Sequence, residues 1–292
     1  GAMLLGLGMA VIILQYYRTT TNEFLTPILA FLSLRFFHRP IRFLLFGGIG
    51  FSMILIGIWG ANRAILKPFE REGRPAWEAV QQYRRKERGI KVVVIGGGHG
   101  LASLLSGIKA YTHNITAIVT VSDDGGSSGE LRRDLGVLPP GDIRNCLSAL
   151  SNDEALLSQV FQYRFKSGVG LEGHSLGNLF ITALAEITGS FEEAVAESGR
   201  VLAIYGQVLP STLSNVQLVG DVRMHDSDAI VQIKGESKIT KAHGRILRVL
   251  LDPPNAQAYP PTVSAILNAD LILVGPGSLY TSILPNLMVS GL

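Results

Sequence analysis

Two uncharged stretches near the N-terminus define the first predicted elements of the chain. Residues 43–61 (FLLFGGIGFSMILIGIWGA) contain no charged side chain over 19 positions, about the length that one helix needs to cross a bilayer. Residues 1–17 are also uncharged and end in Tyr16 and Tyr17, side chains that favour a membrane interface. Together the two stretches predict a membrane anchor of two transmembrane helices, a hairpin, within residues 1–66. A cleaved signal peptide is the alternative for residues 1–17, and the lack of a basic start argues against it.

From Lys91 onward the pattern changes to short apolar runs that alternate with helical segments. The runs 91–95 and 115–121 are continuous and β-branched, as expected of strands buried on both faces of a sheet. A helix is predicted between them over 101–111. The pattern further predicts helices at 143–151, 154–164, 178–188 and 191–204, a strand pair at 216–222 and 229–233, and a last buried strand at 270–274. This order predicts an α/β fold with a doubly wound, mostly parallel sheet and an inserted helical section.

The net charge of the chain changes sign near residue 90, where the hydrophobic pattern also changes. The first 90 residues hold 12 Lys/Arg against 5 Asp/Glu, a net charge of +7, whereas residues 91–292 hold 14 against 18, a net charge of −4. An acidic main domain argues against nucleic acid as a partner, because phosphate neutralisation needs clustered cations. Cys146 is the only cysteine, which excludes an intramolecular disulfide and a zinc site built from cysteines.

The basic side chains also predict an orientation. Residues 62–90 carry eight of them and the loop 18–42 carries four, so the positive-inside rule favours a cell-membrane protein whose main domain faces the cytoplasm. Residues 67–90 form a basic linker, in which a helix is predicted over 76–88. That helix is either solvated or in contact with anionic lipid headgroups.

Glycine-rich turns follow the first and the last predicted strands of the main domain. The first turn carries Gly97, Gly98, His99 and Gly100, and the last carries Gly275, Gly277 and Ser278. Glycine lets backbone N–H groups approach an anion, and a helix N-terminus adds a positive partial charge. The two turns therefore predict a binding site that contacts both ends of a nucleotide diphosphate. Leu101 stands at the third glycine position of the dinucleotide-binding fingerprint, so no NAD is expected, and ordinary tight turns stay open as the alternative.

Two adjacent acids follow the second predicted strand, at the sheet edge where doubly wound folds bind ligands. The turn reads Asp123, Asp124, Gly125, Gly126 and Ser127. Asp123 is placed to accept a ribose hydroxyl, and the two acids are also suited to hold Mg²⁺ on a diphosphate. The local alternative is a capping box, in which Ser127 and Glu130 start the next helix.

A Pro-Pro-Gly turn precedes the helix predicted over 143–151. Asp142 either caps that helix or completes a metal site together with Asp124. Arg144 offers a planar fork for phosphate oxygens, and Asn145 beside it is a further candidate contact.

The segment 173–177 (GHSLG) matches the G-x-S-x-G pattern of serine hydrolases. That pattern requires a buried strand directly before it, and the preceding FQYRFKSGVGLE contains two glycines and three charged residues, which disfavours a hydrolase. We expect instead a loop at the start of the helix over 178–188. From this loop, His174, Ser175 and Asn178 are predicted to face the ligand.

Taken in order, these segments resemble the gluconeogenesis factor family, bacterial relatives of 2-phospho-L-lactate transferase in the CofD-like superfamily. The matching stretches are VVVIGGGHGLASLLSGIK, ITAIVTVSDDGGSSGELRRDLGVLPPGDIRNCL, FQYRF, GHSLGNLF, VLPSTL and GPGSLYTSILPN, which extend through nearly all of residues 91–292. The apolar N-terminus resembles the membrane-anchored branch of this family. The family continues well beyond the position of Leu292, which predicts a chain that is incomplete at its C-terminus.

The resemblance implies a Rossmann-like core that binds a uridine diphosphate sugar, and a role in cell shape and envelope control during gluconeogenic growth. The transferase relatives use a guanosine diphospho-lactate donor with Mg²⁺. By position, Asp124 and Asp142 resemble their metal-binding acids. His99 stands where the family more often has threonine.

A binding and regulatory protein is the leading hypothesis, and a homo-oligomer stays open. The first alternative is an active phospho-lactate-type transferase, in which Mg²⁺ at Asp124 and Asp142 stabilises the departing nucleotide while a bound hydroxyl attacks phosphorus. The second is an NAD(P)-dependent oxidoreductase, suggested by the first glycine turn with Asp123, and the third is a membrane scaffold without a ligand. No nucleophile–base pair can be identified from the sequence, which argues against catalysis.

Overall fold

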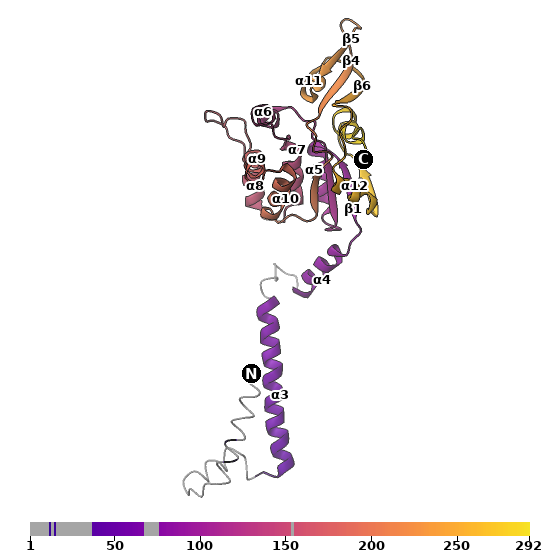
Figure 1. Ribbon diagram of the computed structural model, residues 1–292. Coiled ribbons are helices and arrows are strands. Elements are labelled where there is room, and N and C mark those ends of the chain that lie inside the picture. Colours follow the sequence, from indigo (N-terminus) through magenta and orange to yellow (C-terminus); the bar gives the residue numbers. More distant parts are fainter. Residues whose placement is uncertain (1–11, 13–14, 16–36, 67–75, 153–154) are drawn as a thin grey trace. The chain divides into compact units, whose positions relative to one another are not determined.

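Figure 1 shows a computed structural model of the chain, which describes residues 12, 15, 37–66, 76–152 and 155–292. The chain forms two compact units, residues 1–80 and residues 81–292. The boundary between the units falls within the predicted basic linker over 67–90.

One long helix, α3 (Arg39–Leu66), lies in the N-terminal unit. Its segment Phe43–Ala64 spans 22 residues with a mean hydropathy of 2.0, and its most apolar window is not buried. By length and composition α3 is able to cross a membrane, and it contains the predicted span over 43–61. A hairpin is not shown. The other predicted transmembrane helix falls in residues 1–17, which lie outside the described residues apart from positions 12 and 15.

The C-terminal unit is built around a sheet of four parallel strands, which confirms the predicted α/β class and the mostly parallel sheet. The strands lie in the order β3 (Gln207–Pro210), β2 (Ile115–Val119), β1 (Val92–Gly96) and β7 (Leu271–Val274). Val94 at the centre of β1 pairs with β2 on one side and with β7 on the other. The sequence pattern misses β3, because its four residues are too few to show a period.

Alternate side chains of the central strand enter two apolar layers. Val94 belongs to the larger core, together with side chains of α5 (Gly98–Ile108) and α7 (Gly141–Leu150). Val93 belongs to a second layer, which α12 (Pro260–Leu267) covers from the other face of the sheet. Burial on both faces is the physical reason for the continuous apolar run in this strand.

A group of helices forms the connection from β2 to β3, as the inserted helical section predicts. Its members are α6 (Gly126–Leu135), α7, α8 (Ala155–Gln162), α9 (Leu176–Thr188) and α10 (Phe191–Val201). In Figure 1 these helices lie together on one side of the parallel sheet.

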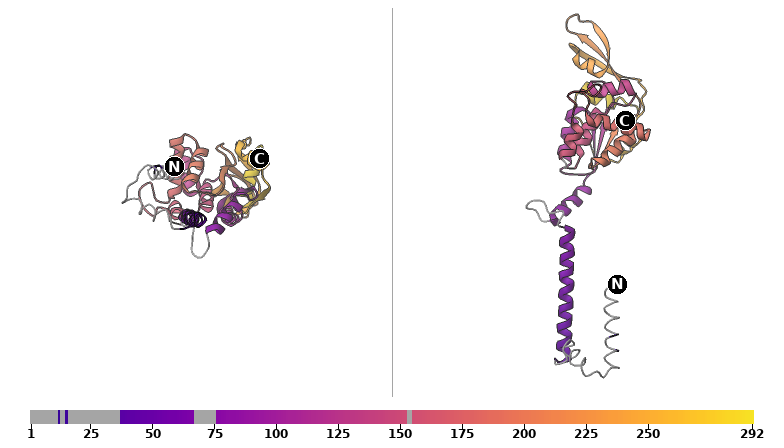
Figure 2. Two further views of the ribbon diagram at one scale, coloured as in Figure 1. Left: turned by 90° about the horizontal axis from the view of Figure 1, so that it is seen from below. Right: turned by 90° about the vertical axis from the view of Figure 1, so that its left-hand side faces the viewer.

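A separate antiparallel sheet projects from this body. Its central strand β4 (Gln217–Met224) pairs with β5 (Ile230–Lys234) and β6 (Gly244–Asp252), in the order β5-β4-β6. Figure 2 shows this sheet, in orange, extending away from the helices. The predicted strand pair is confirmed as β4 and β5. The pattern does not predict β6 or the short helix α11 (Glu236–Lys241) between β5 and β6.

Helix α11 connects this antiparallel sheet to the body. A side chain on Gly220 of β4 would lie 3.1 Å from Ile239 of α11, so the helix packs directly on the strand. At the start of the same helix, the Ser237 N–H donates to Asp124 Oδ1 at 2.8 Å. The antiparallel sheet therefore reaches the carboxyl edge of the parallel sheet.

Further helical segments precede β1 and follow β7 in the chain. α4 (Ala76–Glu87) matches the predicted linker helix, and η2 (Leu279–Ile283) with α13 (Leu284–Leu287) follows β7. Asn286 of α13 is fully buried and donates through Nδ2 to the Gly96 carbonyl at 2.9 Å. This bond ties the segment after β7 to the end of β1.

Candidate functional site

Helices α5, α6, α7 and α9 all begin at the carboxyl edge of the parallel sheet, and their first residues contact one another. The Gly98 N–H at the start of α5 donates to Asp142 Oδ2 of α7 at 2.7 Å. Ser127 at the start of α6 accepts from Asn178 Nδ2 of α9 at 3.0 Å. Because each helix N-terminus carries a positive partial charge, their convergence favours an anion at this edge.

The first glycine turn needs glycine for two separate reasons. A side chain on Gly97 would lie 2.9 Å from Asp142 Oδ2 and 2.9 Å from the methyl carbon of Thr120. The next residue, Gly98, has a φ of +70°, in the left-handed region that favours glycine. The turn therefore brings backbone, rather than side chains, to the sheet edge.

The second glycine turn contacts the first. A side chain on Gly100 would lie 3.2 Å from the Pro276 carbonyl oxygen, and one on Gly277 would lie 3.4 Å from the Gly97 carbonyl oxygen. Gly275 has a φ of +94°, and Ser278 directly precedes η2. Two turns from opposite ends of the domain sequence thus form one continuous surface.

Three acidic side chains gather at the same edge. Carboxylate oxygens of Asp123, Asp124 and Glu236 all lie within 4.8 Å of one another, a spacing that suits a divalent cation. The backbone fixes two of them, because Asp123 accepts from the Gly125 N–H at 2.9 Å and Asp124 accepts from the Ser237 N–H. Sequence reasoning did not find Glu236. No pattern indicates it, since its position depends on the return of the antiparallel sheet to the body.

Burial and mutual repulsion raise the pKa of two acids in this region. Burial, and then the negative charge of Asp123, raises the pKa of Asp142 to about 6. The hydrogen bond from Gly98 and the charge of the exposed His99 act on this pKa in the opposite direction. Burial, with the charges of Asp123 and Asp142, raises the pKa of Glu236 to about 8. Near neutral pH the Glu236 carboxyl therefore holds a proton that a bound cation would displace.

Asp142 does not cap α7, so the capping interpretation of this residue is wrong. The residue before α7 is Pro140, no side chain caps the first turn, and the Asp142 carboxylate accepts from Gly98 instead. Asp142 lies outside the group of three carboxylates, although its charge still acts on Glu236. The pairing of Asp124 with Asp142 as metal ligands stays a prediction.

Arg144 is oriented by the protein itself. One terminal nitrogen donates to Ser175 Oγ, and the other donates to Asn145 Oδ1 at 2.8 Å. Its Nε atom has no hydrogen-bond partner among the described residues. Arg144 therefore fixes the start of α9, and two of its five N–H donors are already used within the protein.

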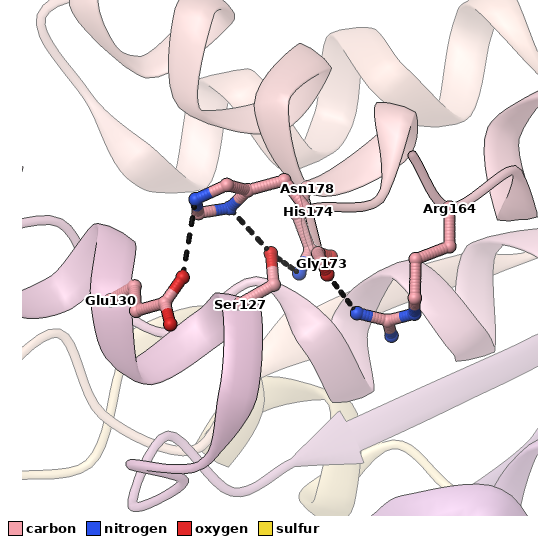
Figure 3. Close-up of polar contacts among 6 residues, drawn as sticks. All are labelled: Ser127, Glu130, Arg164, Gly173, His174 and Asn178. Carbon is pink, nitrogen blue, oxygen red and sulfur yellow. Dashed lines mark hydrogen bonds and ion pairs between the residues drawn. The ribbon is translucent and has the colours of Figure 1, made fainter. Parts of the chain in front are cut away.

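A second polar cluster lies where α6 and α9 begin (Figure 3). Ser127 Oγ lies 2.9 Å from His174 Nδ1, and His174 Nε2 lies 3.2 Å from Glu130 Oε2. Asn178 donates to the same Ser127 oxygen. The predicted capping box is therefore wrong, because α6 begins after Gly125 without a side-chain cap and both of its proposed members contact His174.

The G-x-S-x-G segment is not a hydrolase elbow, as expected. Ser175 is fully buried and serves as the N-cap of α9, accepting from the Asn178 N–H at 3.3 Å. In place of a buried strand, one isolated bridge to Arg164 precedes the helix. Arg164 also donates to the Gly173 carbonyl, which orders the loop ahead of His174 (Figure 3).

A cavity of about 690 Å³ lies at the opposite, amino edge of the sheet. Its lining includes Lys91, Thr116, Gln207 and Asn268, and none of the predicted site residues. We place the candidate site at the carboxyl edge, because the glycine turns, the helix N-termini and the acids converge there.

These features define an α/β protein with a candidate anion-binding site where its parallel strands end. The family model described as 2-phospho-L-lactate transferase CofD matches residues 92–292, so the chain belongs to the CofD family. The predicted family is therefore confirmed.

The chain is similar to curated proteins named as gluconeogenesis factors. It is 50% identical over 278 residues to a putative gluconeogenesis factor of Nostoc sp., a match that covers 91% of this chain and 59% of the relative. It is 51% identical over 199 residues to the gluconeogenesis factor of Bacillus subtilis, covering 68% of this chain and 61% of the relative. The chain thus spans about three fifths of the length of these relatives, and the Nostoc match extends into the segment before residue 92.

A solved structure shares the fold. The crystal structure of a UPF0052 family member from Bacillus halodurans has a TM-score of 0.65 and 50% identity to this chain, covering 70% of this chain and 64% of its own. The likeness therefore covers both the sequence and the fold of the domain. The assignment to a membrane-anchored branch and the C-terminal incompleteness stay predictions.

Proposed function

We propose that the protein binds a nucleotide diphosphate sugar, a UDP-sugar, at the carboxyl edge of its parallel sheet. The contact between the two glycine turns carries the proposal, because Gly97 and Gly277 lie close enough to line one surface. Four helix N-termini point to that surface, and they favour the diphosphate. The donor that remains on Arg144 Nε is suited to one more ligand oxygen.

Mg²⁺ is the cation that suits this ligand. We assign it to carboxylates among Asp123, Asp124 and Glu236, with Asp142 close enough to act through its charge. Oxygen ligands with waters and phosphate oxygens are the usual coordination of Mg²⁺ beside a nucleotide. The cation would offset the repulsion that raises the pKa of Glu236.

The second part of the proposal is that the protein is anchored to the cell membrane. Helix α3 anchors the protein to the cell membrane, and the basic residues after it keep the main domain in the cytoplasm. From there the bound state of the domain reports the supply of nucleotide sugars to envelope synthesis. We further propose a role in cell shape during gluconeogenic growth, and the likeness to proteins named as gluconeogenesis factors supports the gluconeogenic part of it.

Melting of the full chain in detergent micelles tests the binding proposal. UDP-glucose, GDP, NAD and buffer are compared, each with and without Mg²⁺. A ligand at about 100 times its dissociation constant adds roughly 2.7 kcal/mol to the free energy of unfolding. We expect a rise in melting temperature with UDP-glucose and Mg²⁺ and none with NAD. A melting temperature that no nucleotide changes would contradict the proposal.

A matched pair of variants assigns the cation. Asp124→Asn is expected to lose the Mg²⁺-dependent part of the rise. Asp134→Asn removes a charge from an exposed position on helix α6, which follows the turn that holds Asp124, and it should keep the full rise.

A phospho-lactate-type transferase is the second candidate, which the match to the CofD family favours. It predicts that a guanosine diphospho-lactate donor is consumed when a hydroxyl acceptor is added. Binding of UDP-glucose without consumption of such a donor would favour the regulatory protein.

A further inference from the structure

Ser127, His174 and Glu130 are arranged as a nucleophile, a base and an orienting acid. Glu130 Oε2 lies 3.2 Å from His174 Nε2, and an ionised carboxylate accepts hydrogen bonds but cannot donate them. The imidazole proton therefore belongs on Nε2. This leaves a lone pair on Nδ1, which lies 2.9 Å from Ser127 Oγ and accepts its proton.

Asn178 fixes the direction of the hydrogen bond between Ser127 and His174. Its Nδ2 donates to Ser127 Oγ at 3.0 Å, so the hydroxyl proton of Ser127 is left to point at His174 (Figure 3). Asn178 is 1% exposed, and its Oδ1 has no hydrogen-bond partner among the described residues. A buried acceptor of this kind is suited to a hydroxyl of a bound ligand.

The location of Ser127 favours its ionised form. The residue lies in the first turn of a helix of 10 residues, where the helix dipole stabilises negative charge. The same turn abuts the acidic group: at Gly141 a side chain would lie 2.3 Å from Ser128 Oγ and 3.4 Å from Asp123 Oδ2. Ser127 thus lies one residue along α6 from a serine that packs near the proposed cation site.

We propose that Ser127 is a nucleophile that attacks the sugar-bearing phosphorus of the bound nucleotide diphosphate sugar, with His174 as the base. This inference rests on the proposed function. The bond from Ser127 Oγ to phosphorus forms, and the bond from that phosphorus to the bridging oxygen breaks. The nucleoside monophosphate leaves with the electron pair, while the Ser127 proton passes to His174. Glu130 positions the imidazole and stabilises its positive charge.

Water then resolves the covalent intermediate. His174 passes its proton to the departing nucleotide, and it next takes a proton from the water that attacks the phosphorus. The bond from that phosphorus to Ser127 Oγ then breaks, and His174 returns the proton to Ser127. The products are the nucleoside monophosphate and the sugar phosphate, so one water is consumed in each cycle. Slow turnover of this kind would return a regulatory protein to its empty state.

The test uses the full chain in detergent micelles with UDP-glucose and Mg²⁺. UMP release is measured by chromatography, and a hexose phosphate on Ser127 is sought by peptide mass spectrometry after acid quenching. In parallel, a fluorophosphonate probe reports the reactivity of Ser127 towards phosphorus without any nucleotide. Ser128→Ala is the matched control, because Ser128 is an equally buried serine on the same helical turn.

We expect Ser127→Ala and His174→Asn to lower UMP release and probe labelling by about 100-fold or more, while Ser128→Ala stays near wild type. Ser127→Ala should still melt higher with UDP-glucose, which shows that fold and binding survive. A wild-type protein that binds UDP-glucose, yet releases no UMP and labels no faster than Ser127→Ala, overturns the inference and leaves the proposed function intact. Labelling of Ser127 without binding or cleavage of UDP-glucose overturns both the proposed function and the donor assigned to this serine.

Discussion

At Gly97 the lack of a side chain allows the carboxylate of Asp142 to reach the backbone of α5. An added Cβ would lie 2.9 Å from that carboxylate and 2.9 Å from Thr120, and neither neighbour is the far end of a long flexible side chain. The hydrogen bond from Gly98 to Asp142, at 2.7 Å, depends on this close approach. A single small residue therefore holds the starts of α5 and α7 together.

Gly97→Ala is expected to destabilise the protein by about 1–3 kcal/mol, the usual cost of overpacking, and to remove the nucleotide-dependent rise in melting temperature. Gly107→Ala is the control, because nothing lies within 4 Å of a side chain at that position of α5. Replacing a helical glycine there should stabilise the protein by about 0.5–1 kcal/mol. Equal melting temperatures for the two variants would refute the close approach at Gly97.

The raised pKa values of Asp142 and Glu236 predict how stability depends on pH. Both carboxyls bind protons more tightly in the folded protein, with pKa values of about 6 and about 8 against ordinary values of 3.8 and 4.5. Between the ordinary and the raised values the folded state holds more protons than the unfolded chain. The free energy of unfolding contributed by these groups therefore falls as pH rises through this window.

Glu236→Gln should remove the larger part of this effect. Without divalent cations, we expect the variant to be more stable than wild type by about 1–2 kcal/mol at about pH 8.5, after allowance for partial exposure, and to differ little at about pH 4. Adding Mg²⁺ should shrink the difference, because the cation stabilises only the ionised acid. Melting curves of both proteins across this pH range measure the effect, and a gap that does not grow with pH would contradict it.

At the scale of single elements, two helices begin with a serine N-cap, and among the described residues only one of these serines also bonds to another helix. Ser175 caps α9 through the Asn178 N–H and also accepts from the buried Arg144. Ser190 caps α10 through the Glu193 N–H at 3.1 Å. The two helix starts look alike in the sequence, and only the packing of α7 on α9 separates them.

Ser190→Ala is expected to cost about 0.5–2 kcal/mol, the usual loss of an N-cap. Ser175→Ala should cost about 1–3 kcal/mol more, because it also leaves a buried guanidinium donor without its partner. Chemical unfolding of the two variants gives both values. Similar losses would show that the Arg144 contact contributes little to stability.

At the scale of the whole molecule, α3 is the element that we propose anchors the protein to a membrane. Ile56→Arg places a charge near the middle of the apolar segment, which should oppose membrane insertion by about 2.5–3.5 kcal/mol. Ala64→Arg places the same charge at the end of the segment, next to Arg63, and should be tolerated. The fraction of protein that stays in membranes after a carbonate wash measures the effect. If Ile56→Arg stays as firmly as Ala64→Arg, α3 is not the anchor.

The cellular role is also a property of the whole molecule. When Gly97→Ala replaces the chromosomal copy, cells are expected to lose their normal shape on a gluconeogenic carbon source and to keep it on sugars. The Gly107→Ala strain should look like wild type on both. Normal cells in the Gly97→Ala strain under both conditions would contradict a role in envelope control.

The amino-acid sequence by itself determined the elements whose signal is local. Strands β1 and β2 are continuous apolar runs, because both faces of each are covered, and α3 is an uninterrupted apolar segment. The apolar run of β7 was also found, but the prediction that this strand is buried is wrong, because β7 lies at the edge of the sheet and Leu271, Ile272 and Val274 are exposed. Positions such as Gly97 and Asp124 were found for the same reason, since turns that follow buried parallel strands are placed at one edge by the fold class alone.

Tertiary structure decided which of these positions contact one another, and which predictions from the local sequence are wrong. Glu236 joins the acids only because the antiparallel sheet returns to the body, and Ser127 contacts His174 instead of capping its own helix. Asp142 likewise bonds to another helix in place of its own. Each of these polar side chains contacts residues that lie far from it along the sequence, and a contact with its sequence neighbours was the alternative. The choice between them depends on packing between elements, and periodicity and spacing along the chain carry no information about it.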